Sequence, residues 1–323
     1  MHIHDFTCDL TLHHGGILHG ARLRYAVMGK LNEAADNLVV FPTSYAGTHE
    51  NVQWLIGADK ALDPAKYCIV IPNQLGNGES LSPSDGAGPG FPRISHADNI
   101  EIQRQMLASA FSGADIALAI GWSMGAQQAC RWAVEAPAHV KRLMMICGTA
   151  RTRPHNRVFL ESLLATLRVD PRYQTDEPPE AGLKAFGRIY AGWAHSQMWL
   201  REQKHQLLGF DTLEDWVAGF WEARFGARDA NNLTSMALTW IDHDVADGGD
   251  LAAALGRITA DTIVMPSATD LYFTPADCLA DAELIPHAEF REIPTDWGHM
   301  AGSGQSSDDT AFINSAVAEL LAR

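Results

Sequence analysis

The stretch "DIALAIGWSMGAQQACRWAVEA", residues 115–136, decides the fold of this chain. It begins with a continuous apolar run, typical of a strand buried on both faces, and continues with apolar residues at helical spacing. Between the two parts, residues 121–125 read G-x-S-x-G, a pattern that places a serine on a sharp turn from strand to helix. We expect both glycines to be required, because a Cβ there would collide with the adjoining strand or helix. Ser123 is therefore a candidate nucleophile, although the pattern also occurs by chance in loops.

The rest of the chain repeats this alternation of strand and helix. Strands are predicted for residues 37–44, 67–74, 115–123, 140–150, 261–270 and 288–296. Helices are predicted for residues 100–111, 125–136 and 310–323. The N-terminal "HIHDFT" alternates with period two and predicts an edge strand. This order predicts an α/β fold with a mostly parallel sheet flanked by helices, in which ligands lie beyond the carboxyl ends of the strands.

The alternation stops between residues 151 and 255. This region is helical in pattern, rich in tryptophan and without a good strand run. We therefore predict a helical cap at 151–255, inserted into a core domain made of residues 1–150 and 256–323. Aromatic residues of the cap could line an apolar pocket, although packing inside the cap is the commoner use of such side chains. They are Trp193, Trp199, Trp216, Phe220 and Trp221.

A serine nucleophile of this kind needs an acid and then a histidine later in the chain. Asp270 ends the predicted strand 261–270, and His299 follows the next strand. His299 can accept the proton of the serine hydroxyl, while Asp270 fixes the imidazole tautomer and stabilises the imidazolium. Asp296 is the rival acid, but its place three residues before the histidine favours a role in shaping that loop. The order of the residues thus predicts a Ser123-His299-Asp270 triad.

Two backbone N–H groups are the candidates for an oxyanion hole. Met124 begins the helix after the serine, where the helix dipole adds to the stabilisation of a developing negative charge. The second donor is expected in "VVFPTSYAGTHE", residues 39–50, with Tyr45 preferred over Thr43 and Ser44. Alternatively, Tyr45 simply packs under the cap with its hydroxyl partnered.

Composition limits the class of partner. The 323 residues include 24 Lys and Arg against 39 Asp and Glu, a net charge of −15, which argues against nucleic acid or an anionic membrane as partner. No apolar run approaches the roughly 18 residues of a membrane span, and no secretion signal begins the chain. The five scattered cysteines lack a C-x-x-C pair, which favours a reduced, cytoplasmic protein.

Two further patterns could suggest a ligand. The histidines at positions 2, 4, 13, 14 and 19 have no carboxylate or cysteine at metal-binding spacing, so no metal site is predicted there. The loop 73–85 is rich in glycine but lacks both G-x-G-x-x-G and the lysine of a phosphate-binding loop. A flexible rim of the active site is the better interpretation, and we predict no cofactor.

These features together resemble the homoserine O-acetyltransferase-like branch of the α/β-hydrolase superfamily. The resemblance covers nearly the whole chain and rests on segments that include "YAVMGKLNEAADNLVVFPTSYAGT", "IPNQLGNGESLSPSD", "RDANNLTSMALTWIDHDV" and "ATDLYFTP". It implies the α/β-hydrolase fold, a helical lid over a tunnel, a ping-pong mechanism through an acyl-serine, and a homodimer formed through the lid.

The branch contains acetyltransferases, which pass acetyl from acetyl-CoA to an amino-acid hydroxyl, and esterases, which pass it to water. The acetyltransferases have G-G-S-M-G-G at the nucleophile, where this chain has Trp122 and Ala126. In their cap, an arginine can hold the amino-acid carboxylate. The counterpart here is "ARFGARDANN", so Arg228, or Arg224 one turn earlier, could serve, unless Arg228 only pairs with Asp229 at the surface. We take Trp122 and Arg228 as candidate substrate-binding residues.

The departures favour a serine carboxylesterase that hydrolyses small, short-chain acetyl esters. The alternative is an O-acetyltransferase that moves acetyl from acetyl-CoA to homoserine or a related alcohol. The two differ in the final acceptor, which is set by the cap and the tunnel rather than by the nucleophile.

Overall fold

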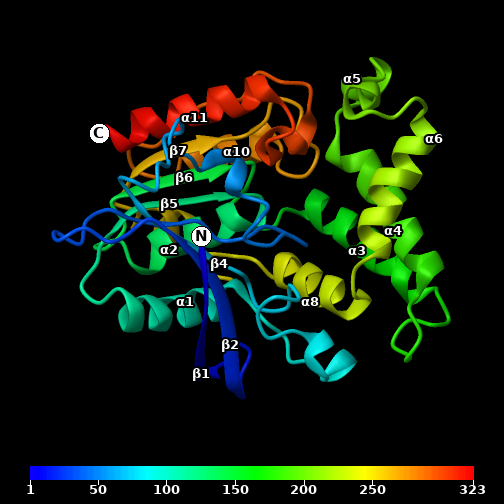
Figure 1. Cartoon of the computed structure of the whole chain (residues 1–323), viewed down its shortest axis with the longest axis horizontal. Helices are drawn as coiled ribbons and strands as arrows, with labels where there is room; N and C mark the ends of the chain where they lie inside the picture. Colours follow the sequence, from blue (N-terminus) through cyan, green and yellow to red (C-terminus); the bar gives the residue numbers. More distant parts are fainter.

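A computed structural model describes the whole chain, residues 1–323, around one eight-stranded sheet (Figure 1). The strand order is β1-β2-β4-β3-β5-β6-β7-β8. The strands are β1 (His2–Thr11), β2 (Ile17–Met28), β3 (Leu38–Val40), β4 (Cys68–Pro72), β5 (Ile116–Trp122), β6 (Arg142–Ile146), β7 (Asp261–Met265) and β8 (Glu289–Phe290). From β4 to β8 in this order all neighbours pair in parallel, whereas β2 pairs antiparallel with both of its neighbours, β1 and β4. The predicted mostly parallel α/β-hydrolase architecture is confirmed.

The predicted strands are all present, and most are shorter than their apolar runs. The N-terminal edge strand is also confirmed as β1, paired only with β2. Strand β2 is absent from the prediction, because arginine, histidine and glycine interrupt its sequence, "ILHGARLRYAVM". Its alternate residues Ala21, Leu23 and Tyr25 are nevertheless buried, so the strand follows a period of two that its polar face obscures.

Helices of the core cover both faces of the sheet. They are α1 (His96–Ala110), α2 (Met124–Glu135), α9 (Leu251–Leu255), α10 (Pro275–Ala282) and α11 (Ser307–Leu321). In Figure 1, α1 and α2 lie below the central strands and α11 lies above them. Within β5, Ala119 faces the hydrophobic cluster shared with α2, whereas Leu118 and Ile120 face the cluster shared with α11. Burial on both faces explains the unbroken apolar run that the sequence shows there.

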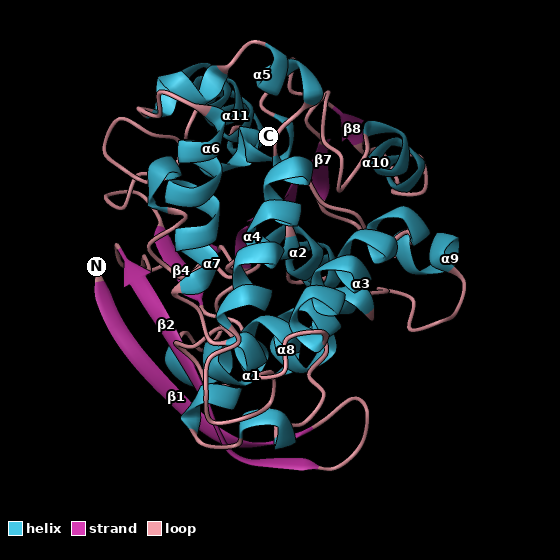
Figure 2. Ribbon diagram, turned by 90° about the vertical axis from the view of Figure 1, so that its right-hand side faces the viewer, coloured by secondary structure: helices cyan, strands magenta, loops and turns pink.

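A cap of helices is inserted between β6 and β7 and lies over the carboxyl ends of the strands (Figures 1 and 2). Its helices are α3 (Pro154–Arg168), α4 (Glu180–Ala194), α5 (Gln197–Arg201), α6 (Leu213–Trp216), α7 (Ala223–Gly226) and α8 (Ala230–Ile241), with a π-helical turn at Val217–Glu222 and a short 3-10 turn at Lys204–Leu208. Further 3-10 turns in the core are Gln53–Leu55, Pro83–Asp85, Gly88–Gly90 and Gly298–Ser303.

The two connections of the cap pair with each other. The Thr152 N–H donates to the His243 carbonyl at 2.9 Å, and the Val245 N–H donates to the Ala150 carbonyl at 3.0 Å. Helix α9, which the sequence assigns to the cap, follows this pairing and leads directly to β7. Both ends of the cap are therefore anchored at one point of the core.

The cap aromatics mainly form its own core. Trp199, Trp216 and Trp221 are at most 1 % exposed, while Trp193 and Phe220 are partly buried against the same cluster. None of the helices combines the length and the apolar composition that crossing a bilayer requires. All five cysteines are free thiols.

Candidate active site

Ser123 sits on a strained turn between β5 and α2. Its backbone has φ 60° and ψ −127°, a conformation that residues other than glycine rarely adopt. A Cβ on Gly121 would lie 2.1 Å from the Gly125 carbonyl carbon, and a Cβ on Gly125 would lie 2.5 Å from the Pro42 carbonyl oxygen. The predicted need for both glycines is confirmed: Gly121 lies against the first turn of α2, and Gly125 lies against the backbone of the loop after β3, so neither position has room for a side chain.

The base and the acid come from the loops after the last two strands. His299 and Asp270 are 2 % and 3 % exposed, and Nδ1 of the histidine lies 2.7 Å from Oδ2 of the aspartate. The other carboxylate oxygen accepts the backbone N–H groups of Tyr272 at 2.7 Å and Phe273 at 3.1 Å. Because Nδ1 is bound to the carboxylate, the second ring nitrogen is left to act on a neighbouring hydroxyl.

Asp296, the rival acid, lies elsewhere in the site. Its carboxylate forms an ion pair with Lys204, and its carbonyl accepts the Ser196 hydroxyl. These two partners belong to the cap, so Asp296 joins the histidine loop to the cap. The structure thus pairs His299 with Asp270, the acid that the sequence favoured.

Ser123 and His299 line the same small cavity at the carboxyl ends of the strands. The cavity has a volume of about 20 Å³ and an aromatic lining. It is lined by Ser44, Tyr45, Trp122, Ser123, Tyr190, Trp221, Arg224, Phe225, His299 and Met300. The structure therefore brings together the three residues of the predicted triad, two of them on the wall of one cavity and the third bonded to the histidine.

The candidate oxyanion donors flank the nucleophile. Met124 is the first residue of α2, so its N–H has no acceptor within the helix. The backbone N–H of Tyr45, in the loop after β3, donates to no backbone carbonyl. The Tyr45 side chain packs under the cap as the alternative interpretation stated, and its hydroxyl donates to the Leu233 carbonyl of α8 at 2.9 Å.

Side-chain amides fix the loop that carries Tyr45. Nε2 of Gln74 donates to the Ser44 carbonyl at 2.9 Å, and Nε2 of Gln128 donates to the Thr43 carbonyl at 3.0 Å. Nδ2 of Asn77 donates to the Gly47 carbonyl at 3.1 Å. Two of these donors, Gln74 and Asn77, come from the loop 73–85 and are buried. At these positions the loop supports the candidate oxyanion loop and is more than the flexible rim that the sequence predicted. These amides could not be predicted from the sequence, because long-range bonds to backbone carbonyls leave no local pattern.

The two candidate arginines separate in the structure. Arg224 lies on α7 and lines the cavity of Ser123, whereas Arg228 follows the end of that helix and lines a different cavity with Glu79 and Asp229. The guanidinium of Arg224 forms no ion pair, and burial lowers its pKa below the ordinary value. Of the two candidates, only Arg224 lines the cavity of Ser123, while Arg228 lies beyond the end of α7 at Gly226; the binding of substrate by either arginine stays a prediction.

One buried cluster has the composition of a metal site. Cys147, Asp270 and His299 each place one ligand atom within 4.8 Å of the others. However, the aspartate and the histidine are hydrogen-bonded to each other, and burial raises the pKa of the Cys147 thiol well above its usual range. The carboxylate and the imidazole Nδ1 are thus already engaged with each other, and we assign no metal ion to this cluster. The N-terminal histidines lie on β1 and the β1–β2 hairpin, where His19 pairs with Asp9.

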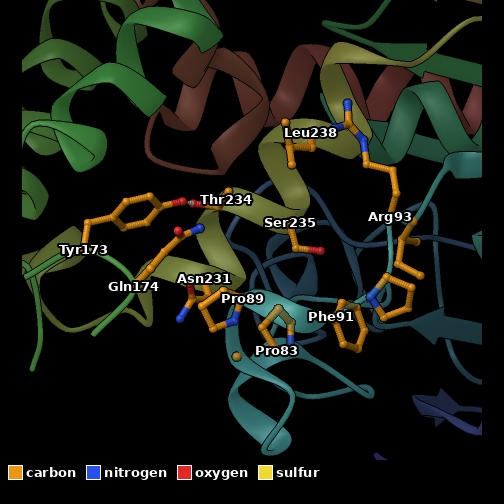
Figure 3. A pocket seen from close by; sticks show the side chains of 13 residues that line it. Pro83, Pro89, Phe91, Arg93, Tyr173, Gln174, Asn231, Thr234, Ser235 and Leu238 are labelled. Atoms are coloured by element: carbon orange, nitrogen blue, oxygen red, sulfur yellow. Dashed lines mark hydrogen bonds between the residues drawn. The ribbon is translucent and has the colours of Figure 1, made fainter. Parts of the chain in front are cut away.

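A larger cavity of about 210 Å³ lies between residues 83–94 and helix α8 (Figure 3). Tyr173, from the loop after α3, reaches over it and shares a 3.0 Å hydrogen bond with Thr234. Neither Ser123 nor His299 lines this cavity, and its walls are largely proline, aliphatic and uncharged polar groups. The chemistry described above is therefore confined to the smaller cavity.

Comparisons with known proteins agree with this geometry. A sequence profile for the α/β hydrolase fold matches residues 37–303. The chain belongs to this family. An ethyl acetate hydrolase from Pseudomonas veronii is 39 % identical to this α/β hydrolase over 324 residues, which cover 97 % of the chain and 93 % of the relative. The solved structure of the acetyl esterase MekB superimposes with a TM-score of 0.97 at 37 % identity, covering 100 % of this chain and 97 % of that one. A homoserine O-acetyltransferase from Trichormus variabilis is 26 % identical to this chain over 308 residues, which cover 89 % of this chain and 85 % of the relative.

Proposed function

We propose that this α/β hydrolase is a serine carboxylesterase that hydrolyses short-chain acetyl esters through an acyl-serine. The observation that carries the proposal is the 2.7 Å contact between His299 and Asp270 beside a cavity that also holds Ser123 on its strained turn. The relatives named as an ethyl acetate hydrolase and an acetyl esterase support the same substrate class.

The mechanism follows from the arrangement of these groups. The Ser123 hydroxyl gives its proton to His299 as the oxygen attacks the ester carbonyl carbon, and Asp270 stabilises the imidazolium that forms. The Met124 and Tyr45 N–H groups donate to the oxyanion of the tetrahedral intermediate. The imidazolium then protonates the departing alkoxide, leaving an acetyl-serine. In the second half, His299 takes a proton from water as the water oxygen attacks the acyl carbon. The imidazolium then returns this proton to the Ser123 oxygen as its bond to the acyl carbon breaks, which releases acetate and restores the free serine.

The size of the cavity favours a small acyl group. A volume of about 20 Å³ has room for little more than one water-sized group beside Ser123. Tyr190, Trp221 and Phe225 border this space, and rigid aromatic rings do not retract as readily as aliphatic side chains. An acetyl group therefore fits the cavity better than a long acyl chain.

The activity test uses p-nitrophenyl acetate and ethyl acetate with the wild-type protein and Ser123→Ala. We expect hydrolysis by the wild type, loss of turnover in the variant, and a burst of one p-nitrophenolate per active site. Turnover of p-nitrophenyl octanoate should be much slower. Unchanged hydrolysis by Ser123→Ala would contradict the proposal.

A second function, acetyl transfer to an alcohol, is favoured by Arg224. This unpaired guanidinium in the cavity of the nucleophile is suited to an acceptor that carries a carboxylate, such as homoserine. The discriminating assay follows thiol release from acetyl-CoA with and without homoserine. Release that depends on homoserine and far exceeds the rate with water would place transfer above hydrolysis.

A homodimer formed through the cap and a cytoplasmic location stay predictions.

A further inference from the structure

Trp122 makes two distinct contacts with His299, a residue 177 positions away. Its indole ring stacks on the imidazole with centroids 5.1 Å apart and planes inclined by 27°. Its Nε1–H donates to the backbone carbonyl of the same histidine at 3.2 Å. One side chain therefore holds both the ring and the main chain of the histidine.

Two further aromatic rings contact the imidazole. The Tyr272 ring packs edge-to-face with the imidazole, with centroids 4.6 Å apart, and the Phe273 ring is tilted against the imidazole, with centroids 5.6 Å apart. The hydrogen bond from Nδ1 to Asp270 fixes one point of the imidazole but leaves it free to rock about that bond. The contacts with three aromatic rings oppose this rocking, and the face of an indole also stabilises a neighbouring cation such as the imidazolium.

The turn that carries His299 is shaped to receive the indole. A Cβ on Gly302 would lie 2.2 Å from Cδ1 and 2.5 Å from Nε1 of Trp122. Contacts this short are not found for real side chains, so Gly302 can be replaced only if the indole moves. Position 302 is thus a notch that fits a tryptophan at position 122.

We propose that Trp122 is a positioning residue for His299, with Gly302 as its matching notch. Trp122 directly precedes Ser123 in the chain. Its contacts with His299 therefore fix the position of the base relative to the nucleophile. The inference rests on the proposed Ser123-His299 chemistry. It assigns Trp122 a role different from contact with the substrate, although its ring also lies on the cavity wall.

The two roles predict different kinetics. Loss of a substrate contact raises KM, whereas a misplaced base lowers kcat with little change in KM when chemistry limits turnover. A displacement on the order of 1 Å at a reacting group can cost about 100-fold in rate. We expect Trp122→Leu to lower kcat by about 10- to 100-fold with KM for p-nitrophenyl acetate within about threefold of wild type. Trp122→Phe keeps an aromatic ring for stacking but loses the five-membered ring with its N–H, so it should restore most of kcat relative to Trp122→Leu.

A double-mutant cycle tests the notch. Gly302→Ala should lower kcat by about tenfold in the wild-type background and by less than about twofold in Trp122→Ala, where the methyl group has space. Trp297→Leu is the matched control, because this indole lies on the same turn but contacts His195 and Trp199 instead of His299. It should keep kcat within about threefold of wild type, and circular dichroism should show that all variants are folded.

The outcomes separate this inference from the proposed function. A rise in KM with unchanged kcat in Trp122→Leu would overturn the positioning role, as would equal effects of Gly302→Ala in both backgrounds. A Trp122→Phe variant as impaired as Trp122→Leu would also overturn the stacking role. If instead Ser123→Ala keeps its activity, the proposed function fails, whatever the Trp122 variants do.

Discussion

Asp270 and His299 are joined at 2.7 Å in the interior, although they follow two different strands of the sheet. Asp270→Asn should keep the shape of this pair while allowing the amide to hold the wrong imidazole tautomer. We expect kcat for p-nitrophenyl acetate to fall by about 10³- to 10⁴-fold. Asp296→Asn is the matched control, since Asp296 pairs with Lys204, and it should retain most of the activity. An Asp270→Asn enzyme with wild-type kcat would show that another group orients the histidine.

Arg224 should determine how the enzyme treats esters that carry a carboxylate. Replacing it with methionine removes the unpaired cation from the cavity but keeps much of the volume. For an O-acetyl hydroxy acid, kcat/KM should fall by about 10- to 100-fold, the equivalent of losing one charge-assisted hydrogen bond. For ethyl acetate, which is uncharged, we expect little change. Arg228→Met should leave both substrates unaffected because Arg228 lines another cavity. Equal losses for both esters would argue against a carboxylate contact.

The nucleophile turn makes a prediction about stability. Gly121→Ala would place a methyl group 2.1 Å from the Gly125 carbonyl carbon, so strand and helix would have to separate. We expect the free energy of unfolding in urea to fall by about 3 kcal/mol, as in other overpacked cores. Gly192→Ala is the contrasting variant, because its Cβ would meet nothing within 4 Å on the exposed side of α4. It should increase the free energy of unfolding by about 0.5 to 1 kcal/mol through helix propensity. A tolerated Gly121→Ala would mean that the turn is looser than described.

Buried histidines should make the protein sensitive to acid. Burial lowers the pKa of His96 and of His195 from the ordinary 6.5 to about 3. The unfolded chain therefore binds these protons near pH 6.5, whereas the folded protein does not bind them until about pH 3. It follows that the free energy of unfolding decreases as the pH falls from 6.5 towards 3. Urea denaturation across this range measures the slope.

His195→Leu isolates one of these contributions. Both ring nitrogens of His195 lack a partner, and the ring packs 3.9 Å from that of Trp199, so leucine suits the site. Between pH 6.5 and 3, the free energy of unfolding should fall less steeply with pH in the variant than in the wild type. The difference in slope should correspond to the uptake of about one proton fewer on unfolding. His2→Leu, on the exposed edge strand, should leave the slope as it is. An unchanged slope in His195→Leu would place the acid sensitivity in other groups.

The proximity of Ser123, His299 and Asp270 could be predicted from sequence because chain order and strand ends determine it. In a parallel sheet the carboxyl ends of all strands meet at one edge, so a serine after one strand and an acid and a histidine after two others converge there. The pairing of His299 with Asp270 rather than Asp296 also followed from this placement. Strand β2 was missed because its polar face is rich in arginine and histidine, and the apolar face alone carries a weak signal.

The arginine of the cavity could not be chosen from sequence. Arg224 and Arg228 are one helical turn apart, and the helix boundary at Gly226 decides which of them faces the nucleophile. That boundary depends on how α7 packs under its neighbours, which local periodicity does not record. The same holds for Gln74 and Gln128, whose partners are carbonyl groups of a distant loop.

Tyr45 connects the two halves of the molecule: it lines the cavity of Ser123, and its hydroxyl donates to the Leu233 carbonyl of α8. On the proposed role of the Tyr45 N–H, we expect a change in α8 that shifts this carbonyl to alter ester hydrolysis without any contact with the ester. For protein engineering, this means that a cap transplanted from a relative needs the Thr43–Gly47 loop of the same relative. Substrate range and turnover are then inherited as one unit.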